Sequence, residues 1–342
     1  MTFSRRHLKF IGIAIFLLFI IVGTLAYRYI LAPNTSSGIV YIHPGCTMEQ
    51  WYDSLRIKDL VQNTNSLRMV ALLKRYNPDT IRSGRYKIRE GMNNNQLINM
   101  FRAGLQQPIA FTFNNIRTVE ELADIAADHF NFTRDEFLAT VKDPEMQARL
   151  GFDSTTIIAL FRPNTYEMYW NTTPEEFLLR MKREYDRFWT PARQEKARQA
   201  QLTPVEVITL ASIIEEETIK AEEYPIIAGV YINRLHRGIK LDACPTLKFA
   251  LGDFTINRIL DKYLEVESPY NTYKYAGLPP GPIRITSIQV IDGVLNYQHH
   301  DYLYFCAKSD FSGYHNFSRT LRQHNAYAAE YHRELNRRRI WK

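Results

Sequence analysis

The longest hydrophobic run lies near the amino terminus. Residues 10–27 (FIGIAIFLLFIIVGTLAY) hold no charged side chain, and a helix of that length, rising about 1.5 Å per residue, just crosses a bilayer core. Arg5, Arg6 and Lys9 precede the run, so the positive-inside rule predicts a cytoplasmic tail (residues 1–9) and an exported remainder. A cleaved signal peptide is the alternative, but the run is long for a signal core and no A-x-A site follows. We therefore expect one uncleaved spanning helix.

After this helix in the sequence, the pattern predicts a linker and then a small α+β module. Residues 28–38 include the polar stretch APNTSSG and are expected to be the linker. In residues 39–106, GIVYIHPG opens like a strand, Tyr86 and Ile88 alternate as in a second strand, and apolar residues from Leu97 onward recur at helical spacing. These alternations predict a module that buries its own core.

Residues 107–342 are expected to form a larger α+β domain. Alternating apolar residues at 109–113 predict a strand, and Thr118 follows as a helix N-cap with Glu121 three residues later. Helical periodicity then alternates with loops rich in Pro, Gly and Asn. The helices predicted beyond this point cover residues 174–188, 204–219, 224–237 and 319–339.

The segment LTPVEVITLASIIEEET carries the clearest signal for a helix start. Thr203 is the predicted N-cap, Pro204 takes the first helical position, and Glu206 completes a capping box. Residues 205–214 are apolar around most of the circumference, which is typical of a helix buried in a core. Carboxylates therefore arrive at the end of a buried helix.

Glu215 is the candidate catalytic acid. At about 100° per residue it lies between the directions of Ile208 and Ala211 and continues an apolar face, whereas Glu216 lies off that face. A carboxyl in an apolar cleft stays protonated near neutral pH and can act as a general acid. The competing interpretation is that these two residues and Glu217 form a solvated acidic helix end, because charge runs usually face water.

Composition and charge exclude several classes of protein. The chain is 45% hydrophobic and 23% charged, which is typical of a globular protein and argues against long disorder or many membrane spans. The net charge is +7, but much of the excess lies near the termini and no interior basic stripe is interleaved with aromatics, so we expect no nucleic-acid partner. A membrane surface or an acidic wall polymer suits this charge.

The cysteine and histidine residues predict no metal or cofactor. Cys46, Cys244 and Cys306 are odd in number and widely spaced, so they indicate neither a disulfide framework nor a CxxC metal site. One pair could still bridge in an oxidising compartment. The nine His residues show no HExxH or comparable spacing.

Several motifs, in this order, resemble the YceG/MltG family of endolytic murein transglycosylases. ASIIEEET at residues 211–218 resembles the family's catalytic ASIxExET signature. The later matches are GVYINRL, CPTLKFALG, SPYNTYKYAGLPPGPI and YHNFS. The resemblance covers most of residues 110–342, and SGRYKIREGMNNNQLINMFRAG resembles the LysM-like module that precedes the catalytic domain in this family.

The resemblance implies roles for particular residues. The first Glu of the signature is Glu215, implied as general acid and then general base, and Glu217 could orient the substrate. Asn164 replaces an Asp usual in the family, and Cys244 stands where a polar residue is usual. For each motif residue a role in a turn or in the core is equally open. The motif positions implied to line a substrate groove are Asn233, Arg234, Thr246, Tyr270, Asn271, Thr272, Tyr273 and His315.

The reaction implied is cleavage of peptidoglycan glycan strands without water. Glu215 would protonate the oxygen between MurNAc and GlcNAc and then take the proton of the MurNAc 6-hydroxyl, which attacks C1 to give a 1,6-anhydro end. The family also implies a single-pass protein of the cytoplasmic (inner) membrane, a periplasmic catalytic domain, and trimming of nascent strands beside penicillin-binding proteins. A hydrolase using the same Glu and a non-catalytic wall-binding scaffold remain alternatives.

Overall fold

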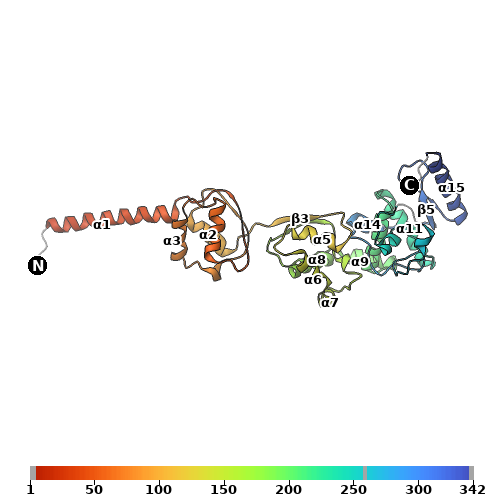
Figure 1. Cartoon of the computed structure of the whole chain (residues 1–342), viewed down its shortest axis with the longest axis horizontal. Helices are drawn as coiled ribbons and strands as arrows, with labels where there is room; N and C mark the ends of the chain where they lie inside the picture. Colours follow the sequence, from red (N-terminus) through yellow and green to blue (C-terminus); the bar gives the residue numbers. More distant parts are fainter. Residues whose placement is uncertain (1–4, 257–259, 339–342) are drawn as a thin grey trace. The chain divides into compact units, whose positions relative to one another are not determined.

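The structure is a computed structural model that describes residues 5–256 and 260–338. It is of mixed α+β class, as predicted, and separates into two compact units (Figure 1). Unit 1 comprises Met1–Phe111, His129–Asn131 and Tyr166–Thr172, and unit 2 comprises Thr112–Asp128, Phe132–Thr165 and Thr173–Lys342. The domain limits expected from the sequence stay a prediction.

Unit 1 begins with the long apolar helix. Helix α1 (Arg5–Ala26) continues into a π-helical turn, η1 (Tyr27–Leu31). Together they contain one stretch, Lys9–Leu31, that is long and apolar enough to cross a membrane and is not buried against the rest of the protein. The helix predicted over residues 10–27 is thus confirmed as a helix. Length and composition make it a candidate membrane anchor.

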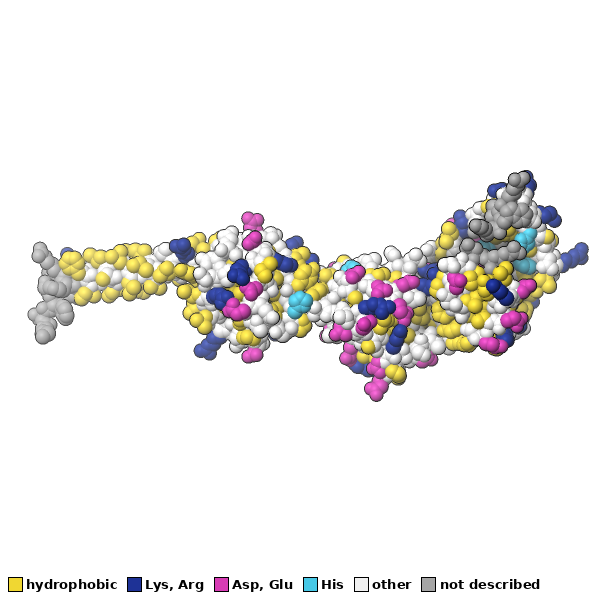
Figure 2. Space-filling model, in the orientation of Figure 1, with side chains coloured by type: hydrophobic (Ala, Val, Ile, Leu, Met, Phe, Trp, Pro, Cys, Tyr) yellow, Lys and Arg dark blue, Asp and Glu magenta, His cyan; other side chains and the backbone are white. Residues whose placement is uncertain are grey.

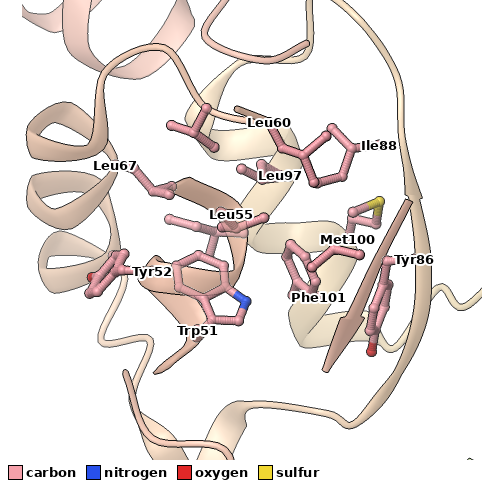
Figure 3. Packing of buried hydrophobic residues seen from close by; sticks show 14 of the residues in the cluster. Trp51, Tyr52, Leu55, Leu60, Leu67, Tyr86, Ile88, Leu97, Met100 and Phe101 are labelled. Atoms are coloured by element: carbon pink, nitrogen blue, oxygen red, sulfur yellow. The ribbon is translucent and has the colours of Figure 1, made fainter. Parts of the chain in front are cut away.

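The rest of unit 1 is three helices packed on a two-stranded sheet. Strands β1 (Gly38–Ile42) and β2 (Gly84–Ile88) pair antiparallel, so the alternation at Tyr86 and Ile88 is confirmed as that of a strand. The aromatic rings of the core are close: the centroid of Phe101 lies 4.5 Å from that of Tyr86 and 5.2 Å from that of Trp51 (Figure 3). The helices are α2 (Met48–Ile57), α3 (Thr64–Leu73) and α4 (Asn94–Ala103), with a 3-10 turn η2 (Pro78–Thr80).

The remaining elements are mostly helices. Strand β3 pairs with β4, and β5 pairs antiparallel with β6. Thr118 caps α5 as predicted, its hydroxyl accepting from the Glu121 amide at 3.1 Å. The bounds are β3 Ile109–Phe113, α5 Val119–Ala127, α6 Arg134–Lys142, α7 Pro144–Leu150, η3 Ile157–Leu160, β4 Asn164–Met168, α8 Pro174–Phe188, α9 Pro191–Gln199, α10 Pro204–Glu217, η4 Ala221–Glu223, α11 Tyr224–His236, α12 Cys244–Leu251, α13 Asp261–Leu264, α14 Ile288–Leu295, β5 Tyr304–Ala307, β6 His315–Ser318 and α15 Leu321–Arg337.

The predicted helices of unit 2 agree with this list. The prediction for α8 matches its bounds, and those for α10 and α11 run one or two residues too far. The helix predicted over residues 319–339 is α15, and residue 339 lies outside the described part of the chain. Helix α14 and the β5–β6 hairpin were not predicted. Helix α14 packs against α10 and α11, and the hairpin helps to enclose the candidate site.

Helix α10 is the central helix around the candidate site. Its residues from Val207 to Ile214 are all buried, as the apolar circumference predicted, and it packs against α9, α11, α12 and α14. The predicted capping box is present: the Thr203 hydroxyl accepts from the Glu206 amide, and the Glu206 carboxylate accepts from the Thr203 amide at 2.7 Å. This cap fixes where the helix starts, and therefore which side chains its last turn presents.

Removing the cap tests its share of the stability. Thr203→Ala is expected to lower the free energy of unfolding by about 1 kcal/mol. The Glu206 amide loses the hydroxyl that accepts its hydrogen bond, and the reciprocal bond from the Thr203 amide to the Glu206 carboxylate is weakened. A thermal melt should show a drop of about 2–4 °C. Thr140→Ala, which removes an exposed hydroxyl within α6, is the matched control and should change stability by less than about 0.5 kcal/mol. Equal melting shifts for the two variants would contradict the assignment.

Candidate functional site

The end of α10 opens into a cavity of about 460 Å³ within unit 2. The walls come from α10, α11, the start of α12, the β5–β6 hairpin and α15, so residues far apart in sequence meet here. Its lining is Glu217, Tyr231, Arg234, Leu241, Asp242, Cys244, Tyr273, Leu303, Tyr304, Phe305, Cys306, Ala307, His315, Leu321 and His324. The mixture of aromatic and hydrogen-bonding side chains suits a polar ligand with apolar faces.

Glu217 is the carboxyl that faces this cavity. It is the last residue of α10, and its Oε1 accepts a hydrogen bond of 3.0 Å from the hydroxyl of Tyr231 on α11. Burial raises the pKa of Glu217 from 4.5 to about 7, against the lowering effects of Tyr231 and of the Lys248 charge. Burial also raises the pKa of Tyr231 well above its ordinary value, so that this hydroxyl stays a donor. Glu217 can therefore hold and release a proton near neutral pH.

Glu216 points to another side of the helix and is held by two arginines. Arg117 donates to both of its carboxylate oxygens at 2.8 and 2.7 Å, and Arg284 donates to Oε1 at 2.6 Å. Arg284 also donates to the side chain of Asn115 at 2.8 Å. The rotation of about 100° per residue accounts for the different surroundings of neighbouring carboxyls. Glu216 thus belongs to a charge network that ties the end of α10 to the loops around it.

Glu215, predicted from periodicity as the desolvated acid, joins this network. Its Oε2 accepts the backbone amide of Ser287 at 3.1 Å, just before α14, and lies 3.6 Å from Nε of Arg284. Its side chain is 16% exposed, against 19% for Glu216. Within the described ranges, Glu215 is not among the residues that line the cavity. These contacts join the end of α10 to the start of α14, as expected of a residue that holds two elements together.

His315 lines the same cavity and is oriented by a buried carboxylate. Glu223, 3% exposed, accepts from the backbone amide of His315 at 2.7 Å, and its other oxygen lies 2.7 Å from the ring Nδ1. Thr218, next in sequence to Glu217, donates to this second oxygen at 3.3 Å. The pairing through Nδ1 leaves Nε2 as the ring nitrogen available to a ligand. The structure thus brings an oriented imidazole to the cavity that Glu217 faces.

Two further predicted residues, Arg234 and Tyr273, line the cavity. Arg234 is 8% exposed, donates to the carbonyl of Leu241 at 2.7 Å and lies 3.2 Å from the Asp242 carboxylate. The Tyr273 hydroxyl lies 3.0 Å from Sγ of Cys244, and burial raises the pKa of that tyrosine. Cys244, like Cys46 and Cys306, is a free thiol. Both predicted side chains shape the wall from positions fixed by their own contacts.

The other predicted groove residues are placed elsewhere, mostly by bonds within the fold. Thr246 and Thr272 hydrogen-bond each other at 2.8 Å and are buried. Asn233 donates to two backbone carbonyls, and so does the fully buried Asn271. Tyr270 lines a separate cavity of about 450 Å³. These contacts are those of turn and loop residues.

Sequence reasoning missed Tyr231, Glu223 and His324. Tyr231 stands within the GVYINRL motif, but its place on a nearly all-apolar helix gave no sign that its hydroxyl meets Glu217. Glu223 follows in a short acidic stretch that resembles a solvated surface. His324 on α15 reaches the cavity through a chain reversal that no local pattern specifies. The one sequence signal for Tyr231 was its place within a motif that the family shares.

One open cavity holds a protonatable carboxyl, an aromatic hydroxyl beside it and an oriented imidazole. These are the parts of an enzyme that works by general acid–base chemistry. The family model of YceG-like proteins matches residues 40–330, and the chain belongs to the YceG-like family. The family assignment made from the motifs is confirmed.

Curated relatives extend the comparison. The endolytic murein transglycosylase of Bacillus subtilis is 28% identical over 264 residues, covering 73% of this chain and 72% of the relative. The protein of the same name from Streptococcus pneumoniae (strain D39) is 26% identical over 322 residues, and 58% of its length is covered. The crystal structure of a YceG-like protein from Listeria monocytogenes matches with a TM-score of 0.55 at 26% identity, covering 85% of this chain and 98% of that one.

Proposed function

We propose that this protein is an endolytic lytic transglycosylase that cleaves the bond between MurNAc and GlcNAc in peptidoglycan glycan strands. Support comes from the family and from relatives in two genera that carry the name endolytic murein transglycosylase. The observation that carries the proposal is the Glu217 carboxyl, whose pKa of about 7 and position at the cavity suit a proton donor. The chemistry proposed needs one such acid and no water.

We assign the acid to Glu217 in preference to Glu215. Glu217 has a hydroxyl partner, faces the cavity and has a pKa of about 7, so that a large share of it is protonated at neutral pH. Glu215 instead accepts the amide that starts α14 and lies near a buried guanidinium. A general acid must reach the leaving oxygen, so access to the cavity decides between them. Both carboxyls are included in the tests below.

The proposed reaction proceeds in two proton transfers at the same carboxyl. Protonated Glu217 gives its proton to the glycosidic oxygen as the bond from MurNAc C1 to that oxygen breaks, which frees the GlcNAc 4-hydroxyl. The acetamido group of the sugar supports the electron-poor C1. The Glu217 carboxylate then takes the proton of the MurNAc 6-hydroxyl, whose oxygen bonds to C1 and closes the 1,6-anhydro ring. The carboxyl ends protonated, ready for another cycle.

The raised pKa predicts how cleavage depends on pH. The acid is active in its protonated form, which predominates below pH 7 and declines about tenfold per pH unit above it. The rate should therefore fall about 100-fold between pH 6 and pH 9. Release of soluble fragments from purified peptidoglycan, followed at a series of pH values, measures this. A rate that is flat or rises across this range would contradict a protonated Glu217.

The pair of His315 and Glu223 is proposed to act on the same substrate. Glu223 positions the imidazole, and Nε2 of His315 is placed to hydrogen-bond a sugar substituent in the cavity. Glu223→Gln should lower kcat/KM at least about 10-fold, because an amide cannot hold the ring as the carboxylate does. Glu223→Asp, which keeps the charge, is the control and should recover part of the lost kcat/KM. An equal loss of kcat/KM in both variants would show that Glu223 has a structural role only.

Fragment length tests the internal cutting that the word endolytic implies. The full chain in detergent, incubated with long purified strands, should release fragments of many disaccharides early in the digestion. Release of single disaccharides from the start would instead indicate cutting at strand ends. No release by the wild type would support the alternative of a wall-binding scaffold.

We also propose the location and partners of the protein. The apolar α1 would span the cytoplasmic membrane once, with the amino terminus inside and the rest of unit 1 and all of unit 2 in the periplasm. Unit 1 would serve as the LysM-like module, and peptidoglycan synthases such as penicillin-binding proteins would be the neighbours of the enzyme. Protease added outside spheroplasts should digest the region after residue 31 and spare an amino-terminal tag.

A further inference from the structure

Helix α3 of unit 1 has two apolar faces, and only one of them is covered. Leu67 and Val70 are 0% and 2% exposed and pack into the core of the unit. Met69, Leu72 and Leu73 are 48%, 79% and 65% exposed. These three residues are spaced i, i+3 and i+4, so they form one stripe along the helix, here called the α3 stripe. A contiguous apolar stripe exposed on a helix is typical of a surface that contacts another protein or a membrane.

The end of the apolar helix is tied directly to this helix. The turn η1 continues α1 and contacts both α3 and α4. The side-chain amide of Asn94 donates to the carbonyl of Tyr29 at 2.7 Å, and Ile30 packs against the core of unit 1. Asn34 and Thr35, in the segment expected to be a linker, are buried. The path from α1 into unit 1 is therefore packed rather than loose.

This attachment limits how far the α3 stripe can be from a membrane that α1 spans. The stretch Lys9–Leu31 has 23 residues, enough to cover about 30 Å of hydrocarbon and end at the interface. Helix α3 has 10 residues and so is about 15 Å long. A helix of that length touching η1 keeps its exposed leucines within one helix length of the interface. Figure 2 shows hydrophobic side chains on the surface of unit 1 beside α1.

The charges around the α3 stripe suit lipid headgroups. No acidic residue occurs in α3, whose sequence is TNSLRMVALL. Lys74 and Arg75 follow directly, and Arg75 is exposed. Arg28 lies in η1. Basic residues beside an apolar surface favour binding to anionic lipids at the interface.

We propose that the α3 stripe lies in the outer interface of the bilayer that α1 spans, so that unit 1 is docked on the lipid surface. The inference rests on the proposed anchoring by α1 and is independent of the catalytic assignment. Lipid is the occupant to expect, because α1 already brings a bilayer to the neighbouring residues. Docking holds the first folded module against the membrane surface.

Fluorescence quenching by brominated lipid tests this with the full chain in vesicles. The native Cys46, Cys244 and Cys306 are changed to Ser, and a bimane label is attached at Leu72→Cys. Ile20→Cys in α1 is the reference for lipid contact, and Ile219→Cys in unit 2, where Ile219 is 88% exposed, is the reference for water. The label at Leu72 should be quenched to at least about half the extent seen at Ile20, and the label at Ile219 should be quenched little.

The outcomes separate the docking from the anchor. Quenching at Ile20 with no more quenching at Leu72 than at Ile219 would overturn docking and leave the anchor in place. An unquenched but blue-shifted label at Leu72 would show that protein, and not lipid, covers the stripe, which also overturns the inference. A label at Ile20 that is not quenched would overturn the anchor and the docking together. None of these outcomes bears on glycan cleavage.

Discussion

Glu217→Gln is expected to lower the rate of glycan cleavage at least about 10³-fold, because an amide has no proton to give to the leaving oxygen. Gln keeps the size of the side chain and can still accept from the Tyr231 hydroxyl, as the carboxylate does at 3.0 Å. The loss should therefore appear in kcat, with little change in KM. Release of soluble muropeptides from purified peptidoglycan is the measurement.

Glu215→Gln is the matched control, two residues earlier on the same helix. It should retain activity within about 10-fold of the wild type, since the amide oxygen of Gln can still accept from the Ser287 amide. Both variants should bind insoluble peptidoglycan and melt as folded proteins. The reverse order of activity, with Glu215→Gln inactive and Glu217→Gln active, would return the acid role to Glu215.

Arg284→Met is expected to cause the largest loss of stability among the charged residues discussed. Arg284 is 8% exposed and bonds Glu216 and Asn115, and its removal leaves partly buried carboxylates short of a partner. Breaking such a pair from one side should lower the free energy of unfolding of unit 2 by on the order of 3 kcal/mol. Calorimetry of the full chain should show one transition moving to lower temperature while that of unit 1 stays in place.

The control for Arg284 is an arginine in an exposed ion pair. Arg187 donates to Glu184 at 3.0 Å, but its side chain is 73% exposed. Arg187→Met should change the free energy of unfolding by less than about 1 kcal/mol, because water replaces the lost contact. Equal shifts for both variants would show that the network at the end of α10 contributes no more than a surface pair.

The sequence predicted the helix that carries the site, because its signals are local. The capping box at Thr203 and the apolar circumference of α10 both lie within one short segment, and the structure has both. The alternation of β2 and the full length of α8 were likewise set by neighbouring residues. Local periodicity is enough to place an element and to state that it is buried.

The choice among three adjacent carboxyls depended on residues far along the chain. Periodicity gives the direction in which the Glu215 side chain points from the helix. The residues that it contacts, Arg284 and Ser287, come about seventy positions later in the sequence. The partner of Glu217 is likewise on another helix. The cavity wall formed by β5, β6 and α15 comes from short strands and a chain reversal that carry weak local signals. Tertiary contacts therefore decided what the sequence pattern left open.

Digestion of purified peptidoglycan in oxygen-18 water tests the central claim most directly. If Glu217 drives an intramolecular attack by the MurNAc 6-hydroxyl, the wild-type products carry 1,6-anhydro ends, weigh one water less than hydrolysed fragments, and contain no oxygen-18 at the new ends. Products that carry one oxygen-18 atom at each new MurNAc end would contradict this claim and show that the same cavity performs hydrolysis.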